Sequence, residues 1–169
     1  MNTIVIAEEN SFSYPRFLTL WAGQLISNLG SGKTAFALGV YVFNRTGTAT
    51  GFSLVMLALF LPAILLRPVG GLLADRWKRR SMIILGDAGS ALSVLLLLFS
   101  FSSGAPALWK IYLCVACNSA FTSLQAPAYK ASVSDLVSEE RYEKAAGLMQ
   151  LSSSAQHLFS PVVAGILLT

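Results

Sequence analysis

Two short motifs in the sequence contain residue types that could bind a phosphate or carry out redox chemistry. The first, Gly30-Ser31-Gly32-Lys33-Thr34, matches the end of a phosphate-binding loop, in which glycine amides wrap a phosphate and lysine supplies positive charge. Ser27 occupies the position of the first glycine of such a loop, and the motif lies inside an apolar run instead of after a buried strand. Nucleotide binding is therefore not expected.

The second motif is a Cys-x-x-Cys pair formed by Cys114 and Cys117. This spacing serves redox or metal chemistry when a thioredoxin-like turn or further ligands accompany it, and the sequence offers neither. Inside an apolar helix the pair is expected to act as small packing residues. We also find no nucleophile–base pair or carboxylate dyad in the sequence. The sequence therefore predicts no metal, no cofactor and no enzymatic activity.

Polar residues recur at helical spacing within three apolar segments. The first set is Gln24, Asn28 and Ser31; the second is Asn118, Thr122, Gln125 and Tyr129; the third is Gln150, Ser153, Ser154, His157 and Pro161. A polar side chain that faces lipid is costly, so each set is expected to face water or another helix. Two interpretations stay open: a polar pathway walled by these segments, or helix–helix packing through small and polar residues. The pathway is favoured for the first two sets, and the third is balanced between the two.

Four ionisable residues lie inside the apolar segments, where the default interpretation is a functional or paired group. They are Lys33, Arg67, Asp87 and His157. Arg67 and Asp87 both lie about 10 Å inside the inner membrane edge, on consecutive antiparallel helices. The sequence therefore predicts an ion pair between them and no transport role for either. Lys33 points away from the polar face of its segment and receives no role, whereas His157 is expected to be a hydrogen-bonded histidine on a polar face.

The composition shows which elements position these residues. Hydrophobic residues make up 54% of the chain and charged residues only 12%, which is too little charge for the surface of a soluble domain. A bilayer core needs about 20 apolar residues to be crossed by a helix. The sequence predicts an all-α, polytopic transmembrane helix bundle over residues 17–169, after an N-terminal segment at 1–16. Its spans are expected near 17–43, 51–74, 81–101, 107–131 and 145–168.

The distribution of basic residues predicts the orientation. The N-terminus and alternate loops carry Arg16, Arg76, Lys78, Arg79, Arg80, Lys130, Arg141 and Lys144, whereas the opposite loops carry Arg45 and Lys110. This asymmetry predicts a cytoplasmic N-terminus and an outer C-terminal end. Glu8 and Glu9 before the first apolar run argue against a secretory signal peptide. An odd number of spans that stops in apolar residues suggests a fragment or an early-terminated product.

The most specific pattern is the inner loop Gly71-Leu72-Leu73-Ala74-Asp75-Arg76-Trp77-Lys78-Arg79-Arg80. A generic cytoplasmic loop explains its arginines but not Gly71 and Asp75 at this spacing, which suit a close helix end and an acid that meets a helix N-terminus. The segment resembles motif A of the major facilitator superfamily, Gly-x-Leu-Ala-Asp-Arg-x-Gly-Arg-Arg. Lys78 stands where that family usually has glycine.

The resemblance extends over nearly the whole chain, and the wider sequence is similar to the macrolide and multidrug efflux branch of bacterial drug:proton antiporters. Gly47-Thr48-Ala49-Thr50 and Pro127-Ala128 contribute to it. It implies that the first and fourth spans line a central cavity. It also implies that Asp75 and Arg79 join Asp135 in a network, with Gly71, Arg76 and Arg80 in the same conformational-switch motif. Ser160-Pro161-Val162-Val163-Ala164-Gly165 resembles a degenerate exporter motif, which favours export over uptake.

The resemblance therefore implies the N-terminal part of a secondary exporter of drugs or other amphipathic small molecules in the bacterial inner membrane. Its expected partners are the substrate, the lipid bilayer and the missing second half, with protons as an open coupling ion and no nucleic acid. Asn118 stands where the family often has an arginine linked to proton coupling, and this argues against coupling through this half. The alternative is a non-transporting membrane interaction protein or an inactive truncated remnant.

Overall fold

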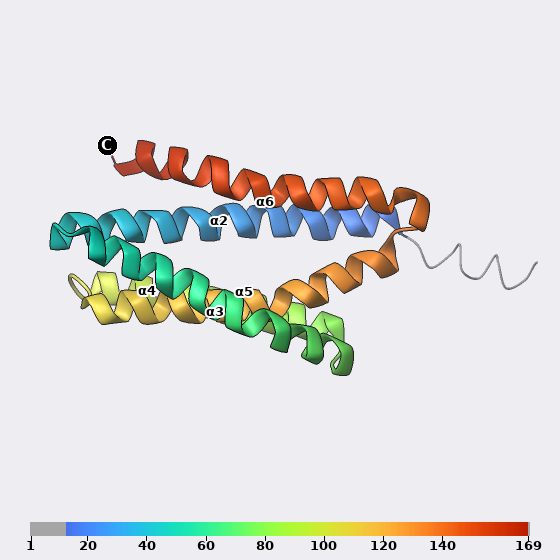
Figure 1. Cartoon of the computed structure of the whole chain (residues 1–169), viewed down its shortest axis with the longest axis horizontal. Helices are drawn as coiled ribbons and strands as arrows, with labels where there is room; N and C mark the ends of the chain where they lie inside the picture. Colours follow the sequence, from blue (N-terminus) through green and yellow to red (C-terminus); the bar gives the residue numbers. More distant parts are fainter. Residues whose placement is uncertain (1–12, 169) are drawn as a thin grey trace, which may run out of the picture. The chain divides into compact units, whose positions relative to one another are not determined.

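The chain folds into long α-helices joined by short connections (Figure 1). The computed structural model describes the backbone of residues 13–168 and the side chains of residues 13–155. The helices are α2 (Tyr14–Thr46), α3 (Ala49–Arg76), α4 (Arg79–Ser102), α5 (Leu108–Leu136) and α6 (Glu139–Leu168). The prediction of an all-α bundle is confirmed. The expected segment at residues 1–16 lies largely outside the described residues.

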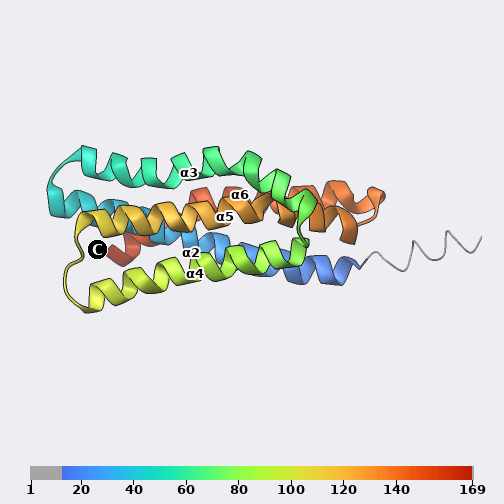
Figure 2. The ribbon, with the colours of Figure 1, turned by 90° about the horizontal axis from the view of Figure 1, so that it is seen from below.

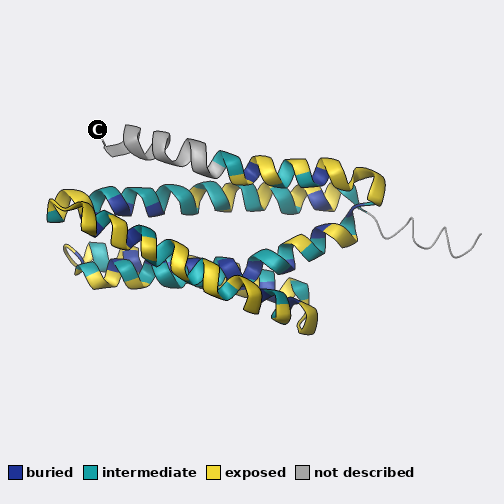
Figure 3. Cartoon of the chain, viewed as in Figure 1, coloured by how far each residue is buried: buried dark blue, intermediate teal, exposed yellow. Residues whose placement is uncertain are grey.

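Each helix is long enough to cross a bilayer. The shortest, α4, has 24 residues, and at a rise of about 1.5 Å per residue this exceeds the ~30 Å hydrocarbon core. Among the described residues, α3 and α4 also have the composition of membrane-spanning helices. Their outward faces carry exposed leucine, isoleucine and phenylalanine side chains, such as Ile64 and Phe99 (Figure 3). The expected windows near 17–43, 51–74, 81–101, 107–131 and 145–168 stay predictions as membrane spans.

The described residues form two compact units. One unit contains residues 1–34 and 130–169, and therefore most of α2, the end of α5 and all of α6. The other contains residues 35–129, and therefore the end of α2, all of α3 and α4, and most of α5.

In the unit of residues 35–129, α5 lies between α3 and α4 (Figure 2). Apolar residues near the connection between α4 and α5 form a buried cluster: Leu38, Val42, Val55, Leu97, Ile111 and Val115. A second cluster joins the other end of α3 and α4 to α5 through Ala74, Met82 and Ala128. These two clusters hold α3 and α4 against α5 at both ends.

Glycines let the backbones of these helices approach closely between the two clusters. A Cβ atom added at Gly70 of α3 would lie 3.1 Å from the Cα and carbonyl oxygen of Leu124. One added at Gly86 of α4 would lie 2.6 Å from the Cβ of Gln125. Helix packing in lipid gains from close contact of this kind, because burial from water contributes little there. The glycines therefore fix where α5 meets α3 and α4.

Pro62 lies inside α3 where this helix contacts α5. Pro62 lacks the N–H that would bond to the carbonyl of Ala58, and its ring weakens the hydrogen bonds of that turn. The hydroxyl of Ser119, which is buried in α5, donates a hydrogen bond to the neighbouring carbonyl of Leu59. This bond ties α5 to α3 one residue after the carbonyl that Pro62 leaves without its helical partner.

Candidate functional site

The inner loop is a tight connection between α3 and α4. α3 ends at Arg76 and α4 begins at Arg79, so Trp77 and Lys78 alone separate them. The N–H of Trp77 donates to the carbonyl of Leu73, which closes the last turn of α3. Lys78 has φ −63° and ψ 118°, an ordinary extended conformation. The turn does not need glycine at this position, and lysine fits where the family motif has glycine.

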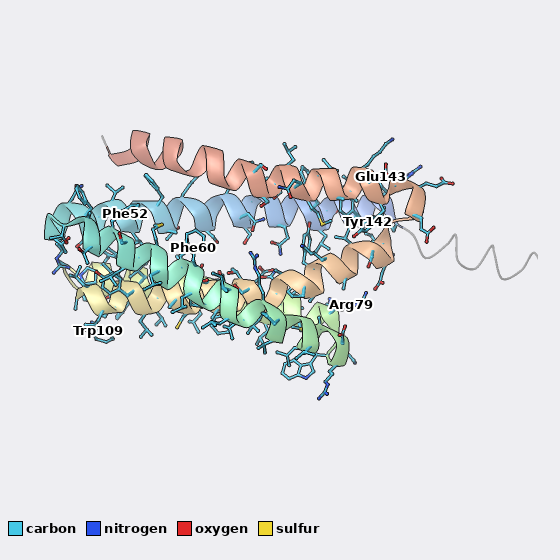
Figure 4. The ribbon with its side chains drawn as sticks, in the orientation of Figure 1. Phe52, Phe60, Arg79, Trp109, Tyr142 and Glu143 are labelled. Atoms are coloured by element: carbon cyan, nitrogen blue, oxygen red, sulfur yellow. The ribbon has the colours of Figure 1, made fainter. Side chains whose placement is uncertain are left out.

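The charges of the loop are mostly exposed. Asp75, Arg76, Lys78 and Arg80 are exposed, and Arg79 is half-buried at the turn (Figure 4). Among the described residues, nothing lies within 4 Å of a Cβ added at Gly71, so that side of the helix end is open. Asp135, an exposed residue near the end of α5, belongs to the other unit. The network of Asp75, Arg79 and Asp135 therefore stays a prediction.

Two amide side chains of α5 are bonded to α4 and form a polar seam between these helices. The Asn118 amide donates to the hydroxyl oxygen of Ser90 at 2.7 Å and to its carbonyl at 3.2 Å. Seven residues later, the Gln125 amide donates to Oδ1 of Asp87 at 2.9 Å. Gln125 is only 4% exposed. Asn118 and Gln125 belong to the second predicted polar set, which also contains Thr122 and Tyr129. For Asn118 and Gln125, contact with a neighbouring helix accounts for the polar side chain.

The other two members of this polar set, Thr122 and Tyr129, have different surroundings. The hydroxyl of Thr122 donates to carbonyls of its own helix, at Asn118 and Ser119, both at 3.0 Å. Tyr129 is half-buried. Neither hydroxyl is bonded to α4 within the described structure, and contact of Thr122 and Tyr129 with a solute stays a prediction.

In the other unit, polar contacts join α2 to α6. The indole N–H of Trp21 donates to the carbonyl of Leu148 at 2.8 Å, and the Asn28 amide donates to the hydroxyl of Ser152 at 3.4 Å. Ser152 is 3% exposed. These contacts bring one predicted pathway residue, Asn28, against α6.

The remaining predicted pathway residues of this unit are spread over several environments. Gln24 and Ser31 are half-buried on α2, whereas Gln150 is exposed on α6. His157 lies outside the described side chains. Ser152 was missed by the sequence pattern because Ser152, Ser153 and Ser154 are consecutive and cover most of the circumference of a helix. Helical phase alone could not identify which serine faces α2.

Asp87 and Arg67, the predicted intramembrane ion pair, are both exposed. The structure shows Gln125 as the hydrogen-bond partner of Asp87. The pairing of Arg67 with Asp87 stays a prediction.

We expect that exchanging the two residues restores part of the thermal stability that either single neutralisation removes, because an unpaired charge in lipid is costly. Melting of the chain in detergent measures this, and an exchange no better than the single changes would contradict contact.

Comparison with known proteins places this arrangement in a family. A sequence model of the Major Facilitator Superfamily matches residues 20–169. The chain is 33% identical over 157 residues to macrolide efflux protein A of Streptococcus pyogenes, covering 90% of this chain and 38% of that protein. It is 32% identical over 152 residues to the uncharacterized MFS-type transporter YfiS of Bacillus subtilis, covering 89% of this chain and 35% of that protein.

A more distant relative is the enterobactin exporter EntS of Shigella flexneri, at 28% identity over 160 residues, 92% of this chain and 38% of that protein. The chain thus spans between 35% and 38% of the length of these relatives. No solved structure matches the chain significantly.

Proposed function

The chain belongs to the Major Facilitator Superfamily, and from this we propose that it forms the N-terminal part of a secondary exporter of amphipathic small molecules in the bacterial inner membrane. The observation that carries the proposal is its similarity to macrolide efflux protein A over 90% of the chain. A second relative is also named as an exporter, of enterobactin. The motif at residues 71–80 and its tight helix connection support the same assignment.

The mechanism that fits this family is a rocking motion of two helical halves around a central substrate site. We propose Gln24, Asn28 and Ser31 of α2, with Gln150 and His157 of α6, as candidate substrate contacts in one unit, and Thr122 and Tyr129 of α5 as candidate contacts in the other. Asn118 and Gln125 are expected to position α4 against α5 instead, because their amides are already bonded there. An amphipathic substrate would meet a few polar groups within an apolar lining.

The alternative function is a non-transporting membrane interaction protein or an inactive remnant. The two proposals differ in whether the chain recognises a substrate. We expect a macrolide to raise the melting temperature of the chain in lipid nanodiscs, because a ligand that binds the folded state alone stabilises it. The change Tyr129→Ala should reduce this shift, whereas Glu140→Gln, at an exposed residue of α6, should leave it unchanged.

A defined assembly with no macrolide-dependent shift would favour the interaction protein. The absence of both a defined assembly and a shift would favour the remnant.

A further inference from the structure

Basic side chains crowd the connection between α3 and α4, at one end of the unit of residues 35–129 (Figure 2). Arg76, Lys78, Arg79 and Arg80 fall within five consecutive positions, and Asp75 is the one acid beside them in the sequence. Arg79 is half-buried, whereas Arg76, Lys78 and Arg80 are exposed. Within the described part of the chain, the structure shows no hydrogen bond or ion pair for these three exposed side chains. Their charges are therefore available to an anionic partner.

Trp77, between Arg76 and Lys78, is also exposed, at 55% of its surface. Its backbone N–H donates to the carbonyl of Leu73 at 2.8 Å and closes the last turn of α3. Among the described residues, the structure shows no hydrogen-bond partner for its indole N–H. An indole combines an apolar body with a polar N–H, and tryptophan is enriched at the level of lipid headgroups for this reason. The exposed ring therefore suits an amphipathic partner.

On each helix, a basic residue at the connection shares a face with an exposed apolar residue one turn deeper. Leu72 precedes Arg76 by four positions on α3, and Ile84 follows Arg80 by four positions on α4. Residues four apart lie one above the other on an α-helix, about 6 Å apart along its axis. Leu72 is 67% exposed and Ile84 is 57% exposed. Each helix end therefore presents a positive charge and then an apolar surface.

The connection has the position of a membrane-surface turn. Proteins of the Major Facilitator Superfamily lie in membranes, and α3 and α4 have the length and composition to cross one. Two such helices joined by Trp77 and Lys78 alone turn back at the membrane surface, where lipid headgroups lie. Clusters of about four to eight Lys and Arg next to a membrane helix attract anionic lipids. Guanidinium and ammonium groups donate charge-assisted hydrogen bonds to phosphate oxygens.

We propose that the connection between α3 and α4 is a binding site for an anionic phospholipid of the surrounding bilayer. The headgroup phosphate contacts the exposed basic side chains of Arg76, Lys78 and Arg80, with the ring of Trp77 at the level of the headgroup. The acyl chains run along the exposed apolar faces that begin one turn deeper on both helices. No covalent bond changes. This site goes beyond the proposed export function and does not depend on it.

The other end of α4 provides a matched control. Trp109 and Lys110 lie at the start of α5 and are both exposed, and Trp109 is 62% exposed. This end therefore has an exposed tryptophan beside a lysine, as at Trp77 and Lys78, without the cluster of further basic residues. A lipid site that requires the cluster should respond to changes at Trp77 and Lys78 and not to the same changes at Trp109 and Lys110.

The test is titration of the purified chain in a maltoside detergent with phosphatidylglycerol, which is anionic, or with zwitterionic phosphatidylcholine of the same acyl chains. Native mass spectrometry measures the bound lipid. We expect phosphatidylglycerol to bind at least about tenfold more tightly than phosphatidylcholine, and Lys78→Gln to weaken its binding roughly fivefold. Trp77→Ala should also weaken it severalfold. Lys110→Gln and Trp109→Ala should leave the affinity unchanged.

A triple change of Arg76, Lys78 and Arg80 to glutamine should remove the preference for phosphatidylglycerol, and circular dichroism verifies that the helices are kept. The single changes at exposed positions give the same comparison if the triple variant does not fold. Glycerol phosphate, which has the phosphate without acyl chains, should not displace the lipid at equal concentration.

Three results would overturn the inference. Equal affinity for the two lipids would remove the anionic site, and equal weakening by Lys78→Gln and Lys110→Gln would leave attraction to net charge alone. Displacement of phosphatidylglycerol by an equal concentration of glycerol phosphate would assign the site to a soluble phosphate ester. Lipid binding is measured without transport, so a chain that binds phosphatidylglycerol but confers no export would contradict the exporter proposal and leave the lipid site standing.

Discussion

Replacing Asp75 with asparagine is expected to inactivate an exporter that contains this chain while leaving the stability of the chain almost unchanged. Asp75 is an exposed residue in the last turn of α3, where the helix already carries partial negative charge. A carboxylate at this end does not stabilise its own helix. Its charge can act on a helix N-terminus of another part of the transporter, and so bias the equilibrium between access states.

We expect transport to fall about tenfold or more, which corresponds to the loss of roughly 1.4 kcal/mol of that bias. The unfolding free energy of the chain in detergent should change by less than about 0.5 kcal/mol, as is usual for exposed positions. Asp75→Glu keeps the charge and serves as the matched control. If Asp75→Asn destabilises the chain as strongly as it reduces transport, the acid serves local folding and the switch interpretation fails.

Replacing Gly86 with leucine is expected to have the largest effect on folding. A Cβ at this position would lie 2.6 Å from the Cβ of Gln125 and 3.1 Å from the carbonyl oxygen of Phe121, so α4 and α5 must separate. Overpacking of this kind costs about 1–3 kcal/mol. The separation would also break the hydrogen bond between Gln125 and Asp87.

The matched control is Gly23→Leu, because the described structure has no atom within 4 Å of a Cβ added at Gly23. Both variants remove one helical glycine and add the same side chain, so helix propensity cancels between them. Thermal or denaturant unfolding in detergent gives the comparison. Equal stability of the two variants would show that the close approach of α4 and α5 is not needed for folding.

The helices of this fold could be predicted from the sequence because their signals are local. Apolar runs longer than about 20 residues, separated by charges or turn residues, are enough to predict membrane-spanning helices. The connection between α2 and α3 also depends on local sequence. Gly47 has φ +66°, a conformation that glycine adopts readily, and the Thr48 side chain caps α3 by accepting a hydrogen bond from the N–H of Gly51.

The contacts of the candidate site were harder to predict, because helical phase shows which residues share a face and not which neighbour that face meets. Helical phase groups Asn118 with Gln125, and the structure shows that both amides are bonded to α4. The depth of Asp87 follows from counting residues along α4. Its hydrogen bond to Gln125 depends on the rotation of two helices about their axes, which the spacing of residues within one helix does not determine.

A chimera tests whether this chain supplies the N-terminal helices of an exporter. The corresponding segment of macrolide efflux protein A would be replaced by this chain, since the two are 33% identical over 157 residues. Macrolide accumulation would then be measured in cells with and without a proton gradient. We predict energy-dependent efflux, which Asp75→Asn abolishes. The contrary result is a chimera that is present in the membrane in normal amount while its cells accumulate as much macrolide as cells that lack the chimera. That result would contradict the proposal that this chain supplies the N-terminal helices of an exporter.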